Sequence, residues 1–368
     1  MESVRVTYRA RVDANEVEAR ADALLLEQSV ELPRAAVTDP FVEREILGEV
    51  EEIAAEAPGS FRITIAFPVA TTALDPAQLL NVLFGNSSLQ EEIELADVEF
   101  PPSVFEAFGG PRYGVAGLRE AAGVHGRPLT CTALKPMGLS AKALAKLCET
   151  FARAGIDVIK DDHGLADHPF CRFEERVAAC QMAVERAADA TGRLALYVPS
   201  VTGTAETVAT QLRFAEGRGV RAVMVSPMLI GLPVLWQLVH GKTELPILAH
   251  PAFGGALRIA PETLFGKIFR LFGADAVIYP SFGGRFAYGE ERCRRLAHVL
   301  RRPWGPLRPA LPVPAGGMTV ERVPELVDFY GSDTMLLIGG SLYEAGEALL
   351  ERSRAFVDSV RAAGGTQT

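Results

Sequence analysis

The residues PLTCTALKPMGLSAKALAKLCETFARAGIDVIKDD (128–162) contain the clearest indication of the fold. The two ends of this stretch are short apolar runs, 128–136 and 156–162, and the amphipathic segment 140–155 lies between them. Near-continuous apolar runs that alternate with helices are typical of parallel strands buried on both faces of a sheet. The stretch therefore predicts a strand–helix–strand unit with parallel strands.

The same pattern continues toward the C-terminus. Six further apolar runs follow, each next to Gly or Pro: LALYVPSV (194–201), AVMVSP (222–227), PILAHP (246–251), AVIYPS (276–281), LPVPAGG (311–317) and TMLLIGGS (334–341). Eight strand units of this kind fit a closed (β/α)8 TIM barrel, and an open doubly wound sheet is the alternative. No GxGxxG motif follows the first strand, which argues against a dinucleotide-binding sheet.

The first 120 residues have a different pattern. The runs VRVTYRARV (4–12) and FRITIAFPV (61–69) predict strands, and Asn15 is the expected cap of a helix over 16–28. Asp75 and Pro76 stand where a helix N-cap and first residue are expected. These signals predict a smaller α+β domain over residues 1–120, followed by the barrel over residues 121–368.

Composition narrows the classes of partner. The chain has 37 Lys and Arg against 46 Asp and Glu, a net charge of −9, so an extended nucleic-acid surface is not expected. A phosphorylated small molecule stays compatible, because local donors bind phosphate in a negative protein. We expect no membrane association and a cytoplasmic location, since no apolar run approaches the roughly 18 residues of a span and the N-terminus has no apolar signal core. The five cysteines lack C-x-x-C spacing and are expected to be buried reduced thiols.

Polar residues gather where the predicted strands end, which is where barrel enzymes carry their active sites. They are Lys135, Lys160, Asp161, Asp162, His163, His250, Tyr279, Ser281, Gly316, Gly317, Gly339, Gly340 and Ser341. Ionisable groups from several strands that converge in one mouth predict an enzyme. The two glycine pairs end the last two strands, where barrel loops often bind phosphate through backbone N–H groups.

Among these strand ends, the run IKDDHG (159–164) has the most ionisable residues. Side chains two apart on a strand point the same way, so Lys160 and Asp162 should share a direction and Asp161 should take the other. Two interpretations stay open on these residues alone. One is a plain ion-pair cluster, and the other is a metal site with Asp162 as an oxygen ligand and His163 beside it.

Six segments, in the same order along the chain, resemble motifs of the RuBisCO superfamily. They are AAEAPGSF (54–61), FGNSSL (84–89), TALKPMGLS (132–140), GIDVIKDDHG (155–164), LPVPAGGM (311–318) and DTMLLIGGS (333–341). The resemblance implies the RuBisCO large-subunit fold, in which a ferredoxin-like domain precedes the barrel. It also implies a homodimer in which Glu56 and Asn86 reach the partner's active site.

The resemblance further implies roles at the barrel mouth. Lys160 resembles the lysine that CO2 converts to a carbamate, which with Asp162 binds Mg2+, and Lys135 resembles a catalytic base. His250 resembles a family histidine at the end of strand five, with a core or supporting role as the alternative. The implied phosphate-binding residues are Gly316, Gly317, Gly339, Gly340 and Ser341.

Several positions differ from the motifs of the carboxylases, and these differences bear on the function as much as the matches do. His163 stands where they have a glutamate ligand, so His163 is the expected third metal ligand and a divalent metal other than Mg2+ becomes compatible. Met137, Pro251 and Ala315 replace a lysine, an arginine and a serine, and YPSFGGRF (279–286) replaces the strand-six histidine and the lysine-tipped loop. Losses on this scale argue against carbon fixation and favour a RuBisCO-like protein (form IV), without a small subunit.

The retained groups suffice for removing a proton next to a carbonyl. The resemblance to the proteobacterial branch predicts isomerisation of 5-methylthioribulose 1-phosphate in methionine salvage. The alternatives are enolisation of a diketo-methylthiopentyl phosphate, decarboxylation of a 3-oxo-isoapionate 4-phosphate, and, in another class, a non-catalytic regulatory protein.

Overall fold

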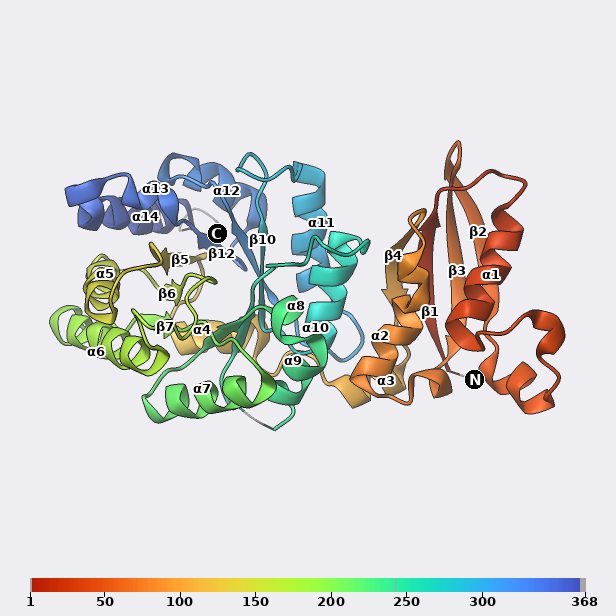
Figure 1. Cartoon of the computed structure of the whole chain (residues 1–368). Helices are drawn as coiled ribbons and strands as arrows, with labels where there is room; N and C mark the ends of the chain where they lie inside the picture. The colour runs from red at the N-terminus through yellow and green to blue at the C-terminus, as the bar shows by residue number, and fades with distance from the viewer. Residues whose placement is uncertain (1, 242, 365–368) are drawn as a thin grey trace.

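A computed structural model describes residues 2–241 and 243–364 and contains two unlike sheets (Figure 1). The N-terminal part is an antiparallel sheet of β1 (Ser3–Ala10), β2 (Glu49–Ala57), β3 (Ser60–Pro68) and β4 (Ile93–Glu99), in the order β2-β3-β1-β4. Helices α1 (Val17–Ser29) and α2 (Pro76–Phe84) connect its strands. This β-α-β-β-α-β order is that of the ferredoxin-like fold.

Local signals at the helix starts were right in one case and wrong in another. Asp75 caps α2 as predicted, and its side chain accepts hydrogen bonds from the backbone N–H groups of Ala77 and Gln78. Asn15 does not cap α1, because the helix begins one residue later and its N-cap, Glu16, makes no side-chain hydrogen bond. Strand β2 (EVEEIAAEA) was not predicted, because it is acidic and largely exposed along its length and therefore lacks the apolar alternation of a half-buried strand.

The C-terminal part contains the eight parallel strands, each inside a predicted run. They are β5 (Leu129–Leu134), β6 (Val158–Asp161), β7 (Leu196–Val198), β8 (Val223–Val225), β9 (Ile247–Ala249), β10 (Ala276–Pro280), β11 (Leu311–Ala315) and β12 (Met335–Leu337). The surrounding and connecting helices are α3 (Pro102–Phe108), α4 (Gly114–Ala122), α5 (Ala141–Arg153), α6 (Phe173–Thr191), α7 (Ala205–Gly217), α8 (Pro227–Ile230), α9 (Leu232–Val239), η5 (Glu262–Ile268), α10 (Phe269–Leu271), α11 (Glu290–Arg301), α12 (Val323–Tyr330), α13 (Gly340–Tyr343) and α14 (Leu349–Gly364). The predicted fold class, a TIM barrel after a smaller α+β domain, is confirmed.

Two seams close the barrel. The ladders run β12-β5-β6-β7 and β11-β10-β9-β8, and a bridge between Ser200 and Met224 joins β7 to β8. At the other seam, the Thr334 hydroxyl donates to the Pro312 carbonyl over 3.1 Å. The Leu311 N–H points to β10, where it bonds the Asp275 carbonyl, so the alternating residues Pro312 and Pro314 face β12. Proline has no N–H, which is why no regular ladder forms there.

Side chains fill the barrel interior below the mouth. Leu129, Val158, Leu248 and Leu311 are almost completely buried there, and α4 adds Leu118 to the same cluster. The interior is therefore a packed core rather than a pore, which leaves the carboxyl ends of the strands as the place for a site. The boundary at residue 120 stays a prediction.

The two parts are joined at the edge strand β4. The Leu95 N–H donates to the Arg258 carbonyl and the Ala260 N–H donates to the Leu95 carbonyl, both over 2.9 Å. Lys267, only 3% exposed, donates to the Val98 carbonyl over 2.7 Å. The loop between β9 and η5 is therefore anchored on the N-terminal sheet.

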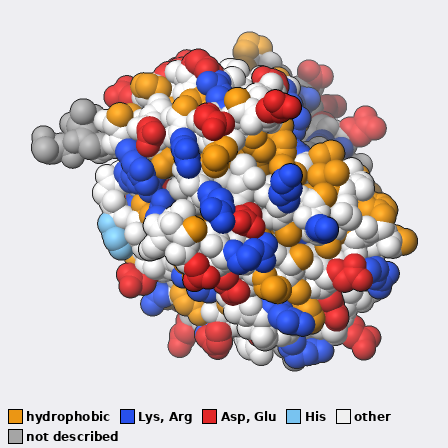
Figure 2. Space-filling model, turned by 90° about the vertical axis from the view of Figure 1, so that its left-hand side faces the viewer, with side chains coloured by type: hydrophobic (Ala, Val, Ile, Leu, Met, Phe, Trp, Pro, Cys, Tyr) orange, Lys and Arg blue, Asp and Glu red, His pale blue; other side chains and the backbone are white. Residues whose placement is uncertain are grey.

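The outer barrel surface in Figure 2 shows acidic and basic side chains interspersed, without a continuous basic field on this face. No helix among the residues that the structure describes is both long enough and apolar enough to cross a membrane.

Candidate active site

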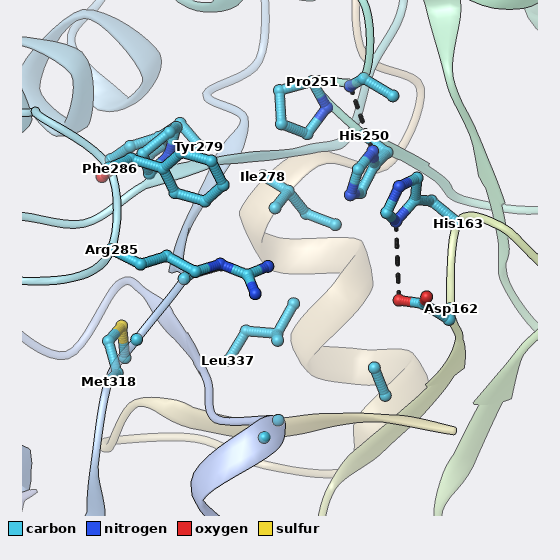
Figure 3. A pocket seen from close by; sticks show the side chains of 18 of the residues that line it. Asp162, His163, His250, Pro251, Ile278, Tyr279, Arg285, Phe286, Met318 and Leu337 are labelled. Carbon is cyan, nitrogen blue, oxygen red and sulfur yellow. Dashed lines mark hydrogen bonds and ion pairs between the residues drawn. The ribbon is translucent and has the colours of Figure 1, made fainter. Parts of the chain in front are cut away.

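A cavity of about 840 Å³ opens at the carboxyl ends of the barrel strands (Figure 3). Two lysines, one aspartate and two histidines predicted from the sequence line it: Lys135, Lys160, Asp162, His163 and His250. They lie at the carboxyl ends of β5, β6 and β9, so the closed barrel gathers residues that are far apart in the chain.

The end of β6 shows the predicted alternation. Lys160 and Asp162 line the cavity, whereas Asp161 is fully buried on the other side of the strand. There Asp161 accepts hydrogen bonds from Arg176 Nε and the Tyr197 hydroxyl, both over 2.9 Å. Asp161 is therefore a structural anchor of the strand that carries the two cavity residues.

Asp162 is the centre of charge in the cavity. Its Oδ1 atom lies 2.7 Å from Lys135 Nζ and 3.5 Å from His163 Nδ1. Burial alone would raise the pKa of Asp162, but the hydrogen bonds from His163 and Lys135 and the charge of Lys160 outweigh it and hold the pKa well below its usual range. Asp162 is therefore ionised and available to bind a cation.

Lys160 is an unusual lysine because it is only 2% exposed. Its amine donates to the Asp161 carbonyl over 2.9 Å, and burial lowers the pKa of the amine. A lower pKa makes the uncharged amine easier to form, and the uncharged amine is the nucleophilic state.

His250 is held in one protonation state and one tautomer. Burial and the positive charge of Lys160 lower the pKa of His250 to about 2, so the ring is neutral at working pH. The Ala252 N–H donates to His250 Nδ1 over 3.1 Å, which leaves the ring proton on Nε2. The ring also stacks on His163, with centroids 4.2 Å apart. His250 can thus donate a hydrogen bond from Nε2.

The two glycine pairs also line the cavity. Gly316 and Gly317 both have φ of +91°, a conformation that side chains disfavour, and no described residue accepts a hydrogen bond from either N–H group. Ser341 donates to the Met318 carbonyl over 2.9 Å and thereby ties the second glycine segment, which includes Gly339 and Gly340, to the first. Free amides on two linked turns can bind an anion.

Arg285 is a cavity residue to which sequence reasoning assigned no role. In Figure 3 its side chain extends into the middle of the cavity, and it has no carboxylate partner within the described parts of the chain. Its own N–H donates to the Gly316 carbonyl over 3.1 Å, so the strand-six loop is bound to the glycine turn. The only available signal was that Arg285 is the one basic residue of the segment 279–286.

Comparison with known proteins assigns the family. The family model "Ribulose bisphosphate carboxylase large chain, catalytic domain" matches residues 114–348. The chain is 48% identical to ribulose bisphosphate carboxylase-like protein 1 of Rhodopseudomonas palustris, over 99% of both chains. It is 44% identical to the 5-methylthioribulose-1-phosphate isomerase of Rhodospirillum rubrum, over 98% of this chain and 96% of the relative. A crystal structure of a RuBisCO-like protein from R. palustris superimposes with a TM-score of 0.91, at 44% identity and 99% coverage of both chains.

The chain belongs to the RuBisCO large-chain family and is a RuBisCO-like protein.

Two residues implied by the resemblance lie outside the cavity of their own chain. Glu56 accepts a 2.7 Å hydrogen bond from Arg9 on the N-terminal sheet. Asn86 donates to Glu27 over 2.9 Å and to Glu31 over 2.7 Å. A role for Glu56 and Asn86 in catalysis by this RuBisCO-like protein therefore requires a second chain.

Not every polar strand-end residue faces the mouth. The Ser281 hydroxyl is fully buried and lies 3.0 Å from the Tyr330 hydroxyl in the helix layer. Tyr279 is also fully buried, and its hydroxyl has no hydrogen-bond partner among the described residues. Tyr279 is nevertheless among the residues that line the cavity, whereas Ser281, which directly follows β10, is not, because its side chain is turned into the helix layer.

Proposed function

We propose that this RuBisCO-like protein enolises a phosphorylated ketose and acts as a 5-methylthioribulose-1-phosphate isomerase, without CO2 fixation. The observation that carries the proposal is one cavity that combines an ionised aspartate, a buried lysine amine and free backbone amides on two glycine turns. The named isomerase among its relatives supports the choice of substrate.

The residues fit the metal and the carbamate that the family resemblance implies. No group of three or more His, Cys, Asp and Glu side chains is placed to hold a metal among the described residues, so Asp162 and His163 alone are a short donor set. A carbamate on Lys160 would add the missing oxygen ligand, and the lowered pKa of this amine favours the uncharged form that reacts with CO2. Mg2+, or a divalent metal that accepts imidazole, would supply positive charge next to the substrate carbonyl oxygen.

Side chains and backbone amides of this protein would then transfer the proton, orient the substrate and bind the phosphate. Lys135 is the proton carrier that takes a proton from the carbon next to the carbonyl and returns one to a neighbouring carbon, so the reaction is an isomerisation without net oxidation. The Nε2–H group of His250 donates to a substrate oxygen and holds its orientation. The amides of Gly316, Gly317 and Gly339 bind the phosphate, with the cation of Arg285 nearby and Gly340 and Ser341 supporting the turn.

Three side chains at the barrel mouth differ from those of the carboxylases. Pro251 and Ala315 line the cavity where the carboxylases carry an arginine and a serine, and Met137 is 54% exposed at a position where they carry a lysine. None of these three side chains can donate a hydrogen bond to a second phosphate or to a carboxylate.

We also propose a homodimer, because Glu56 and Asn86 complete the site only from a partner chain.

The direct test is hydrogen exchange in deuterated water. Purified protein with Mg2+ and bicarbonate would be incubated with 5-methylthioribulose 1-phosphate, ribulose 1-phosphate and a diketo-methylthiopentyl phosphate, and product formation and deuterium incorporation would be followed by NMR. We expect isomerisation with incorporation of deuterium only for the first. Turnover of the diketone alone would assign the enolase alternative, and no exchange with any of the three would refute both the isomerase and the enolase.

A further inference from the structure

A hydroxyl group outside the cavity holds the end of the strand that leads to Lys135. Tyr343 is the last residue of α13, the short helix after the second glycine segment, and it does not line the cavity. Its hydroxyl donates a hydrogen bond to the Ala133 carbonyl over 2.9 Å and accepts one from the Lys135 N–H over 3.0 Å. One side-chain atom therefore bridges two backbone groups at the carboxyl end of β5.

This hydroxyl stands in for a strand residue. Strand β12 ends opposite Cys131, where the Ile338 N–H donates to the Cys131 carbonyl over 3.0 Å. In a parallel ladder, one residue donates to a residue of the neighbouring strand and accepts from the residue two positions further along it. The Tyr343 hydroxyl makes this pair of bonds to Ala133 and Lys135, so it continues the ladder after β12 has ended.

Lys135 lies where the regular ladder stops. It directly follows β5, and Pro136 behind it has no N–H group to extend the pairing. Its side chain runs beside the second glycine segment, because a Cβ atom on Gly339 would lie 3.9 Å from Lys135 Cε, and its amine reaches Asp162 over 2.7 Å. The place from which this amine extends therefore depends on the backbone that Tyr343 holds.

Tyr343 is itself held firmly enough for this role. Burial raises the pKa of Tyr343 well above its usual value, so the hydroxyl keeps its proton and can donate it. The ring packs edge-on against Phe151 of α5, with centroids 5.5 Å apart and an angle of 78° between the planes. The hydroxyl therefore has a defined position relative to β5.

The same short segment carries amides that we assign to the phosphate. Gly339 and Gly340 open the segment, the Leu342 N–H donates to the Gly339 carbonyl over 3.0 Å, and Tyr343 closes it. The proposed phosphate turn and the anchor of Lys135 are thus separated by a single turn of backbone. A substrate with its phosphate at this turn meets an amine whose distance from the phosphate is set by the fold.

We propose that Tyr343 is a positioning residue for the proton carrier Lys135, and that its hydroxyl sets the distance between this amine and the phosphate-binding turn. Tyr343 acts only through the backbone of Lys135, since it lies outside the cavity lining. The inference rests on the proposed function for the role of Lys135, and it adds the group that holds Lys135 in place. Misplacing a reacting group by about 1 Å can cost on the order of 100-fold in rate, so loss of the hydroxyl should lower kcat rather than substrate affinity.

The variant Tyr343→Phe removes the hydroxyl and keeps the ring on Phe151. We expect kcat for 5-methylthioribulose 1-phosphate to fall roughly 10- to 100-fold, while KM changes by less than about 2-fold. The Kd of 5-methylthioribitol 1-phosphate, which lacks the carbonyl group and cannot react, should also stay within about 2-fold of the wild-type value in calorimetric titrations with Mg2+ and bicarbonate.

The matched control is Tyr113→Phe. The Tyr113 hydroxyl also donates to a backbone carbonyl, that of Glu244, but Glu244 precedes β9 and lies at the amino ends of the barrel strands. Both variants lose a bond from a tyrosine hydroxyl to the backbone, so their thermal midpoints show the structural cost of that loss. Only Tyr343→Phe should lower kcat.

A second readout does not depend on turnover. Pyridoxal 5′-phosphate combines a phosphate with an aldehyde, which condenses with a lysine amine to an imine and releases water, and borohydride then reduces the imine to a stable amine. Mass spectrometry would compare the labelling of Lys135 with that of Lys146, which is exposed on α5. We expect inorganic phosphate to block labelling of Lys135 in the wild-type protein, and the ratio of Lys135 to Lys146 labelling to fall roughly 5-fold or more in Tyr343→Phe.

An unchanged kcat in Tyr343→Phe, a parallel loss of kcat and ligand affinity, or an equal loss of kcat in Tyr113→Phe would overturn the inference. Labelling of Lys135 that phosphate does not block, or that persists without the hydroxyl, would overturn it as well. Phosphate-sensitive labelling that depends on Tyr343, without any turnover of 5-methylthioribulose 1-phosphate, would refute the isomerase and support the positioning role. Turnover with the same kcat in wild type and Tyr343→Phe would refute the positioning role alone.

Discussion

The buried pair of Asp161 and Arg176 gives the sharpest test of how the barrel holds its active site. Both side chains are fully buried, and Arg176 also donates to the Ala166 carbonyl over 2.9 Å and to the Cys171 carbonyl over 3.3 Å. Burial alone would lower the pKa of Arg176, but the charge of Asp161 outweighs it and the pKa stays above its usual value. Arg176 therefore fixes both the end of β6 and the loop that follows it.

Arg176→Met should leave a buried carboxylate without its cation. The Tyr197 hydroxyl and the Ser200 N–H would still bond Asp161, yet breaking a buried pair from one side typically costs about 3–5 kcal/mol in the free energy of unfolding. Removing the charge as well, in Asp161→Asn/Arg176→Met, should recover about 1–3 kcal/mol relative to the single variant. Since Lys160 flanks Asp161, we expect the single variant also to lose the proposed isomerase activity.

The measurement is urea unfolding followed by circular dichroism, combined with the NMR assay on the folded fraction. Arg186→Met is the matched control, because Arg186 lies on the same helix, is 51% exposed and pairs with Glu149 at the surface. It should change the free energy of unfolding by less than about 0.5 kcal/mol. A loss below about 1 kcal/mol for Arg176→Met, or no recovery in the double variant, would show that the pair does not anchor the strand.

The remaining predictions concern the cavity and the assembly. Lys160→Met should abolish turnover. The free energy of unfolding should stay within about 1 kcal/mol of the wild-type value or rise, because an apolar chain of similar length replaces a buried amine. A strongly destabilised variant would instead indicate a structural ion pair. His163→Glu should tighten Mg2+ binding in calorimetric titrations without conferring CO2 fixation, and an unchanged affinity would show that His163 is not a ligand. His250 is neutral in the folded protein, with a pKa of about 2, whereas an unfolded histidine becomes protonated below about pH 6.5. The free energy of unfolding should therefore fall by about 1.4 kcal/mol per pH unit as the pH drops below about 6.5. With a chelator present, His250→Asn should make this dependence on pH less steep, and an equally steep dependence would contradict the assignment. Mixing and reassociating the inactive variants Lys160→Met and Asn86→Ala should restore about a quarter of wild-type activity if each site uses two chains, whereas no restoration would speak against a shared site.

Much of this molecule could be predicted from the sequence, since the decisive signals are local. The eight barrel strands were found because parallel strands buried on both faces are short apolar runs, and the opposite directions of Lys160 and Asp161 follow from the two-residue period of a strand. The family resemblance likewise rests on short local motifs, most of which lie at strand ends. The domain boundary and the contribution of Glu56 and Asn86 to a neighbouring site stay predictions.

The environments of these residues, in contrast, follow from the folded molecule and not from local sequence. Arg176 as the partner of Asp161, the neutral state of His250 and the outward direction of Ser281 depend on which elements pack beside each strand, and burial and neighbouring charge have no local signature. The same holds for Phe253 and Phe286, which are ordinary phenylalanines in the sequence. Both line the cavity because the fold brings the loops after β9 and β10 to the barrel mouth, where tertiary packing determines what each side chain faces.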